Sequence, residues 1–487
     1  MSTSAPAKSS GSATHRSLVP ARMDRLPWAR FHWMVVVGLG ISWILDGLEI
    51  QIVSNAGFQS EFHMNSAQVG LVGTVYLVGE VVGALVFGRL SDKLGRRKLF
   101  ILTLFVYLAG SAIAGLSPAV WFLLLFRFIA GTGIGGEYAA INSAIDELIP
   151  RKYRGHVDIA INGTYWGGAA LGAAANLLFL NTHIFDQNVG WRLAFFIGPV
   201  LGIVIIFLRR HIPESPRWLM THGYEKDAEK TVSDIEDRVR ANGFQLDDVD
   251  DSETIEIIPA GSISFGRIAR VLFVDYPKRT LVGLTMMITQ SFLYNAIFFT
   301  YVLVLENFFK VPEDQTPYYF FPFAIGNLIG PLVLGRLFDS WGRRQMIFLT
   351  YGLSGVVLAV SAFLFSIGAM NAPLQVTFWC VAFFFASAGA SSAYLTVSEI
   401  FPLEIRSQAI SYFFAVAQIF GALGPVIFGA LVGDGKARGP LVAGDFVGAG
   451  VMVIGGVIAL IFGVDAARKG LEAVTSPLSV VGSDNKK

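Results

Sequence analysis

The chain has 487 residues, of which 53% are hydrophobic and 15% are charged, with a formal net charge of +1. Soluble domains carry roughly 25% charged residues, so this composition excludes an ordinary soluble protein. The single Cys380 excludes a disulfide within the chain and gives no support to a metal–thiolate cluster.

In chain order, the first feature is a polar tail, residues 1–30, which is rich in Ser and Ala and has scattered arginines. It has no apolar core, so we expect disorder rather than a cleaved signal peptide. Twelve apolar runs follow, each close to the roughly 20 residues that a helix needs to span a bilayer. They are 33–56, 67–90, 99–117, 119–145, 157–181, 189–208, 280–305, 318–338, 345–368, 373–397, 407–432 and 441–464. The sequence predicts an all-α membrane protein with twelve transmembrane helices.

A charged segment, residues 209–278, separates six runs from the other six. It is too short and too polar for a catalytic domain with its own core. We therefore expect an N-terminal six-helix bundle over 31–208, a central loop over 209–278, a C-terminal bundle over 279–465 and a tail over 466–487. Lys and Arg concentrate in alternate loops, and the positive-inside rule then predicts that both termini are cytoplasmic.

Two motifs occur in both halves. GRLSDKLGRR, beginning at Gly88, recurs as GRLFDSWGRR from Gly335, and E-x-x-P-x-x-x-R recurs from Glu147 to Glu399, in each case about 250 residues later. Internal duplication is typical of transporters whose binding site lies between the repeats, near the middle of the membrane.

With these motifs, the chain resembles the major facilitator superfamily from about Arg30 to Ala467. PESPRWL from Pro213 and SEIFP from Ser398 resemble its sugar-porter branch. The resemblance implies two pseudo-symmetric six-helix bundles with cytoplasmic latches that close one face during transport. The expected gating residues are Asp92, Arg96, Glu147, Arg154, Glu214, Arg217, Asp339, Arg343, Glu399 and Arg406. For Asp92, a merely solvated position in a basic loop is the alternative.

Ionisable side chains inside the spans are functional candidates, because a charge within the bilayer is costly. At a rise of about 1.5 Å per residue, Asp46 lies about 20 Å into the first span and Arg127 about 12 Å into the fourth, from the opposite side. These depths predict an Asp46–Arg127 pair if the two helices are neighbours. The alternative is a permanent structural ion pair without a proton cycle.

The resemblance supports this contact. In proton-coupled relatives, an acid of the first span faces an arginine in an R-x-x-x-G-x-G pattern, which Arg127 to Gly133 match, and the acid carries the proton. Asp46-Gly-Leu-Glu49 resembles the D-G-x-D signature of aromatic-acid/proton symporters. The buried acids Glu80 and Glu137 are expected to relay protons, pair with arginine or stay neutral. The expected proton-coupling residues are Asp46, Glu49, Arg127 and Glu137.

The seventh span resembles the Gln-Gln-x-x-x-x-Asn pattern of sugar porters, although Thr289 replaces the first Gln. Tyr394 occupies the position of a tryptophan in those proteins. Both departures disfavour a hexose but keep a cavity of amides and aromatic rings, which suits a small polar ring. The expected substrate-binding residues are Asn162, Trp166, Gln290, Tyr294, Asn295, Tyr394 and Gln418. Packing is the alternative for any single aromatic residue.

The sequence thus predicts proton-coupled symport of a small polar organic metabolite by alternating access. That metabolite is an aromatic or organic acid, a related ring compound or a sugar. We expect a monomer in the cell membrane, with the proton as coupling ion and no cofactor, metal or nucleic acid. The alternatives are a proton-independent sugar facilitator and a transporter-like receptor. An enzyme is not expected, because no span shows a His/Glu metal cluster, a Gly-x-Ser-x-Gly elbow or a phosphate-binding loop. The glycine pattern GTGIGGE lies inside a span, outside any βαβ context.

Overall fold

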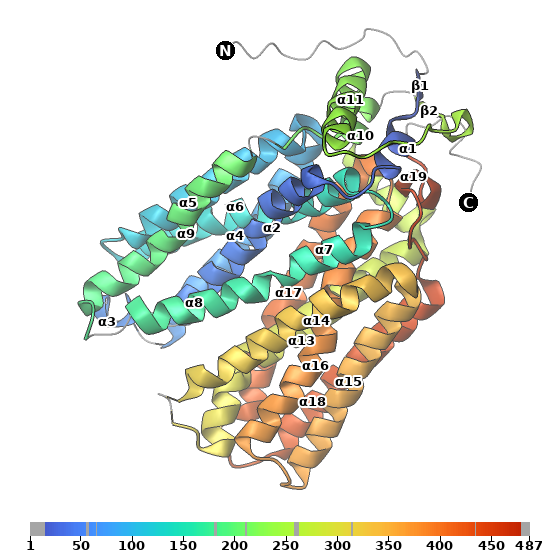
Figure 1. The fold of residues 1–487 in the computed structure, drawn as a ribbon. Coiled ribbons are helices and arrows are strands. Elements are labelled where there is room, and N and C mark those ends of the chain that lie inside the picture. Colours follow the sequence, from blue (N-terminus) through green and yellow to red (C-terminus); the bar gives the residue numbers. More distant parts are fainter. Residues whose placement is uncertain are drawn as a thin grey trace.

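The computed structural model describes residues 15–54, 58–64, 66–179, 183–209, 212–257, 263–312, 315–433 and 435–478. Among these residues, eleven helices are long and apolar enough to cross a membrane. Two short strands, β1 (His15–Ser17) and β2 (Ile255–Ile257), pair antiparallel at one end of the helical bundle (Figure 1). The described chain is thus a helical membrane fold, as the apolar runs predict.

The helices of the N-terminal half follow the predicted spans. They are α2 (Arg30–Ser54), α3 (Phe58–Glu61), α4 (Ser66–Leu94), α5 (Arg96–Gly115), α6 (Val120–Leu148), α7 (Arg154–Gly163), α8 (Tyr165–Phe179) and α9 (Gln187–Arg209). The predicted span 157–181 is divided into α7 and α8 at Thr164, whose hydroxyl bonds back to the Ile161 carbonyl at 2.6 Å. Such back-bonding bends helices. Neither piece alone has the length of a span, so the count of twelve stays a prediction.

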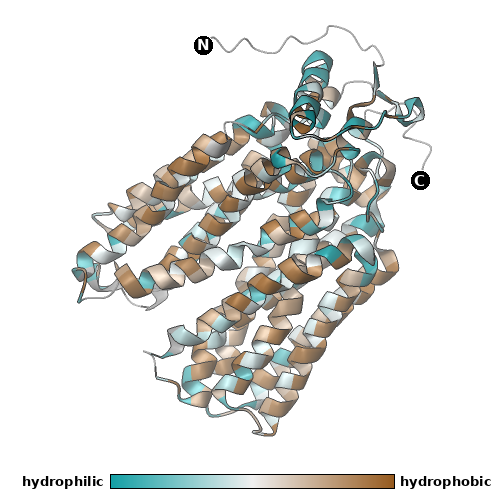
Figure 2. Ribbon diagram, in the orientation of Figure 1, coloured by the Kyte–Doolittle hydropathy of each residue, from teal (hydrophilic) through white to brown (hydrophobic). Residues whose placement is uncertain are grey.

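The C-terminal half repeats the arrangement. Its elements are α13 (Pro277–Phe309), η3 (Thr316–Tyr319), α14 (Phe320–Ser340), α15 (Arg343–Ser366), α16 (Ala372–Ile400), η4 (Leu403–Ile405), α17 (Arg406–Val432) and α18 (Gly439–Phe462). The halves meet mainly where α4 packs on α17 and α7 packs on α14. Apolar residues cover the long helices of both halves (Figure 2). The arrangement in two bundles therefore agrees with the internal repeat.

Glycines allow helices within each half to pack closely. A β-carbon on Gly47 would collide with the Tyr165 carbonyl oxygen, and one on Gly168 would collide with the Ile44 carbonyl oxygen. These contacts hold α2 against α8, and small residues have the same role in many membrane interfaces. On α4, by contrast, a β-carbon on Gly73 would meet nothing within 4 Å.

The remaining elements gather with β1 and β2 at one end of the bundle, which we term the tail side (Figure 1). They are α1 (Val19–Asp24), α10 (Pro216–Thr221), α11 (Glu225–Ala241), η1 (Asp251–Glu253), α12 (Phe265–Arg270), η2 (Val271–Asp275) and α19 (Leu471–Val474). Hydrophilic residues concentrate at this end (Figure 2).

The structure differs here from the expected disordered tail. Residues 1–14 lie outside the described part of the chain, but β1 and α1 are regular, and Val19 and Met23 are buried. Arg22 and Arg25 lie 2.8 and 2.6 Å from Glu236 of α11. Burial alone would raise the pKa of Glu236, but its hydrogen bonds from these two arginines bring that pKa below its ordinary value of 4.5. The composition of the tail gives no indication of this acidic partner.

Candidate functional site

A cavity of about 160 Å³ lies between the two halves. All seven residues predicted to bind substrate line it, and they come from α7, α8, α13, α16 and α17. An engineered cavity of roughly 150 Å³ holds one benzene molecule, so the space suits a compound of about one ring.

Aromatic rings form much of the cavity wall. Trp166 of α8 lies 5.7 Å from Tyr294 of α13, between ring centroids, and Trp43 of α2 lies 4.6 Å from Tyr138 of α6. Neither Trp43 nor Tyr138 is among the binding residues that the sequence predicts. Trp43 precedes Asp46 by one helical turn, so the neighbouring acid was a signal that could have identified it.

Side-chain amides form the polar part of the wall. Gln418 of α17 donates through Nε2 to Glu80 Oε2 of α4 at 3.2 Å, a bond that joins the two halves. Its Oε1 accepts from Ser291 Oγ at 3.0 Å, and Asn295 donates to the Ser291 carbonyl at 2.8 Å. On the opposite wall, Asn162 donates to Asn142 Oδ1 at 3.1 Å. For Glu80 the sequence left a proton relay, a pair with arginine or a neutral acid open, and the structure places it in the cavity wall.

The predicted Asp46–Arg127 pair is wrong. Arg127 Nη1 lies 2.5 Å from Glu49 Oε1, and both side chains are at most 1% exposed. Glu49 also accepts a hydrogen bond from Ser111 Oγ at 2.7 Å. Asp46 and Glu49 are one turn apart, or about 5 Å along the helix, which is within the error of a depth estimate from sequence. The longer glutamate side chain reaches the arginine.

Asp46 has hydroxyl partners instead. It accepts hydrogen bonds from Tyr76 Oη at 3.0 Å and from Tyr138 Oη, and within the described part of the chain it forms no ion pair. Arg127 lies over the Tyr76 ring at 4.1 Å, so the two acidic sites are neighbours through that tyrosine. Tyr138 also lines the cavity, which links Asp46 to the space for a ligand. Glu137 is buried on the same helix, and the described cavity lining does not include it.

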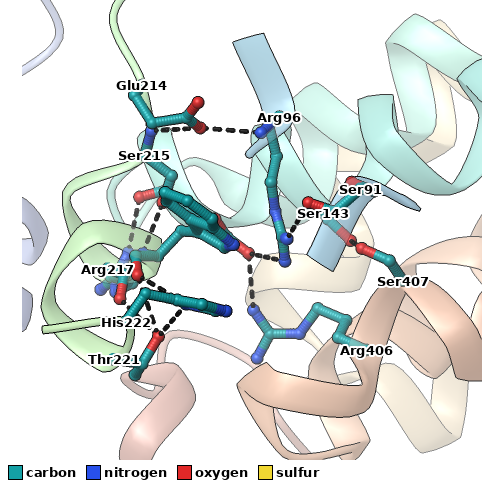
Figure 3. Close-up of polar contacts among 12 residues, drawn as sticks. Ser91, Arg96, Ser143, Glu214, Ser215, Arg217, Thr221, His222, Arg406 and Ser407 are labelled. Carbon is teal, nitrogen blue, oxygen red and sulfur yellow. Dashed lines mark hydrogen bonds and ion pairs between the residues drawn. The ribbon is translucent and has the colours of Figure 1, made fainter. Parts of the chain in front are cut away.

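Three of the predicted gating residues of the first half, Arg96, Glu214 and Arg217, lie near one another at the tail side (Figure 3). Arg96 lies 3.1 Å from Glu147, and Arg406 of the second half lies 3.9 Å from the same carboxylate. Glu214 accepts hydrogen bonds from the backbone N–H groups of Arg96 and Arg97, at the first turn of α5. Burial raises the pKa of Glu214 above its ordinary value.

The glycine of the Gly-Arg-Arg motif is required where Glu214 caps the first turn of α5. Gly95 has φ 89°, and a β-carbon there would collide with the Glu214 carboxylate. In the second half, Gly342 has φ 104°, and Asp465 accepts from the Arg343 backbone N–H at 3.1 Å. A carboxylate therefore caps the equivalent helix in each half.

The second half has its own cluster. Arg343 lies 2.9 Å from Glu399 and 2.8 Å from Asp339. Asp339 also accepts from the His156 backbone N–H of α7 at 2.8 Å, so this contact joins the halves. The side chain of Asp92 lies outside the described residues.

Asp24 of α1 joins the tail to the gating residues. It lies 3.2 Å from Arg154 and 3.0 Å from Arg217, both of which are at most 1% exposed. Arg217 also lies 3.0 Å from Glu472 of α19. The ordered tail segments therefore contact the same arginines that the motifs predict.

In the part of the chain that the structure describes, polar contacts between the halves are found at the tail side and at the cavity. Ser143 and Ser407 are 3.0 Å apart at the tail side (Figure 3), where the contacts of Glu147 with Arg406 and of His156 with Asp339 are also found. At the cavity, Gln418 joins Glu80. The tail side is thus the closed end of the space between the halves.

Comparison with known proteins identifies the family. The family described as "Sugar (and other) transporter" matches residues 41–477, which is most of the chain. The chain belongs to this family. The resemblance to the major facilitator superfamily is confirmed, and the protein is a multi-pass membrane transporter of the sugar and metabolite type.

Individual relatives share about a quarter of their residues with this chain. The niacin transporter NiaP of Acinetobacter baylyi is 26% identical, over 84% of this chain and 89% of the relative. Polyol transporter 5 of Arabidopsis thaliana is 26% identical, over 76% of this chain and 72% of that transporter. The solved structure of the proton:xylose symporter XylE bound to 6-bromo-6-deoxy-D-glucose has a TM-score of 0.75 at 16% identity, over 91% of this chain and 99% of the other. That likeness shows the fold.

Proposed function

We propose that this transporter carries out proton-coupled symport of a small polar metabolite built on one ring. The observation that carries the proposal is the cavity between the halves, where amides and aromatic rings lie next to the buried acid Asp46. The ring is that of an aromatic acid, a related ring compound or a sugar. The relatives include transporters named for niacin and for polyols, which supports this range.

Asp46 is our proton site. Burial of a carboxylate without a cationic partner is costly, whereas Arg127 compensates the charge of Glu49 at 2.5 Å. Proton binding at Asp46 removes that cost. Glu49 and Arg127 then act as a fixed pair that positions Tyr76 on one side of Asp46.

Tyr138 is the proposed link between proton and substrate. Its hydroxyl donates to Asp46, and the same residue lines the cavity. When Asp46 takes up a proton, it becomes a poorer acceptor, and the Tyr138 hydroxyl is free to turn to a ligand. A ligand that holds Tyr138 in turn favours the protonated acid, because coupling between two sites is reciprocal.

We assign the tail side to the cytoplasm. The positive-inside rule favours this orientation, since the loops rich in Lys and Arg lie there. The closed tail side then corresponds to a conformer shut toward the cytoplasm, and transport requires the latch contacts of Arg96, Arg343 and Arg406 to open. We propose a monomer of two six-helix halves, with α7 and α8 together as one span and the proton as the coupling ion.

Uptake into proteoliposomes tests this function. A panel of radiolabelled aromatic carboxylates, ring carboxamides, hexoses and polyols is offered with an acidic exterior, and again without a pH gradient. Accumulation of one ring compound above equilibrium, only with the gradient, supports symport. Equilibration at the same rate with and without the gradient contradicts it and indicates a facilitator.

A further inference from the structure

Two side chains in the cavity wall hold hydrogen-bond acceptors that no described residue satisfies. Glu80 is 1% exposed, and while its Oε2 accepts from Gln418, its Oε1 has no partner within the described part of the chain. Asn162 is 5% exposed, and its Oδ1 is likewise without a partner there. Buried acceptors without a donor are uncommon in folded proteins and point to a missing partner.

The orientation of the Asn162 amide is set by its neighbours. Its Nδ2 faces three acceptor oxygens, namely Asn142 Oδ1 at 3.1 Å, the Asp158 carbonyl at 2.8 Å and Asp158 Oδ1 at 3.1 Å. Only the nitrogen of an amide can donate, so the oxygen is the atom left over. The atom of Asn162 without a partner is therefore its acceptor oxygen.

The charge of the cavity wall also disfavours an anionic ligand. Glu80 is an acid, and none of the described lining residues is Arg, Lys or His. A ring carboxylate would meet no cation in this cavity, and buried charges need partners. Arg127, which lies over the ring of Tyr76, is paired with Glu49 at 2.5 Å.

We infer that the cavity selects ring compounds that carry an N–H donor, either a carboxamide or a protonated amine. The nitrogen donates to Glu80 Oε1 and to Asn162 Oδ1, while the ring lies among Trp43 and Trp166. A protonated amine also gains from the faces of these rings, which attract cations. The inference rests on the proposed function, since it names the substrate class of the same cavity, and it departs from the aromatic acid that the sequence favours.

Ligand binding to purified protein in detergent micelles tests the inference without any proton gradient. Trp43 and Trp166 line the cavity, so intrinsic tryptophan fluorescence reports on occupancy. The probes are benzamide, benzylamine and benzoate, which share one ring and differ in the polar group. At pH 7.5 we expect the wild type to bind benzamide and benzylamine at least about tenfold more tightly than benzoate.

The variant Glu80→Gln keeps the size of the side chain and removes its charge. It is expected to reduce the preference for benzylamine over benzoate by about tenfold or more. Gly73→Ala, at an open position on the same helix, is the matched control and should leave all three affinities unchanged.

Tighter binding of benzoate than of benzamide by the wild type overturns the inference, and this result needs no variant. Unchanged affinities in Glu80→Gln also overturn it. A preference for benzoate together with proton-driven uptake would refute the selection of N–H donors but would leave the proposed symport intact. A preference for the amide and amine without any effect of a pH gradient on uptake would refute symport alone.

Discussion

Loss of one partner from the Glu49–Arg127 pair is expected to destabilise the protein strongly. The two side chains are at most 1% exposed and 2.5 Å apart, so solvent compensates neither charge when the other is removed. Truncation of one partner in a buried ion pair costs about 3–5 kcal/mol. Arg127→Met and Glu49→Gln are each expected to lower the free energy of unfolding by about this amount.

The double variant removes both charges at once. Replacement of a whole buried pair by neutral side chains is often nearly neutral, so the double variant should be more stable than either single variant. A double-mutant cycle should then give a coupling energy of more than about 3 kcal/mol, at or above the upper end for residues in contact. Asp46→Asn combined with Arg127→Met is the matched control. Among the described residues Asp46 forms no ion pair with Arg127 and is linked to it through Tyr76, so it should show much weaker coupling.

Unfolding in mixed micelles of mild detergent and sodium dodecyl sulfate measures these free energies for the wild type and all variants. The reasoning is refuted if Asp46 couples to Arg127 more strongly than Glu49 does. Additive effects of Glu49→Gln and Arg127→Met would equally refute it.

Three other perturbations address the tail and the helix packing. Asp24→Asn leaves two buried arginines short of a carboxylate and should lower the melting temperature, whereas Glu229→Ala, at a partly exposed ion pair, should cost less than about 1 kcal/mol. Gly47→Val should abolish the monodisperse peak in size-exclusion chromatography, and Gly73→Val should retain it. The pKa of Glu236 is held below 4.5 in the folded protein, so its stabilising contribution is present above that value and is lost as the pH falls through the folded pKa. Protection factors for hydrogen exchange in β1 and α1, which are corrected for the intrinsic pH dependence of exchange, should therefore fall at acidic pH, and protection factors that do not change with pH would contradict this.

Much of the fold follows from the sequence because the bilayer imposes simple rules. Long apolar runs predict the helices. The repeated motifs predict the two halves, because each motif consists of residues that a local contact requires. At Gly95, for example, the positive φ and the Glu214 cap explain why the motif contains glycine. The seven residues predicted to bind substrate line one cavity, and four of them are amides, which are too polar to face lipid.

The parts that sequence did not predict depend on contacts between distant residues. The choice of Glu49 over Asp46 as the partner of Arg127 is a matter of one helical turn. The order of the tail depends on Glu236, more than 200 positions away along the chain. Sequence does not predict that Glu80 Oε1 lacks a partner, because this depends on the hydrogen bond that Gln418 donates to Glu80 Oε2.

In the proposed mechanism, Asp46 couples the proton to the substrate. The direct measurement compares wild type and Asp46→Asn in proteoliposomes, with net accumulation driven by an acidic exterior and counterflow exchange at equal pH. We predict that the variant loses accumulation and retains exchange, because the proton site is removed while the cavity remains. Accumulation by Asp46→Asn at the wild-type level would contradict the account.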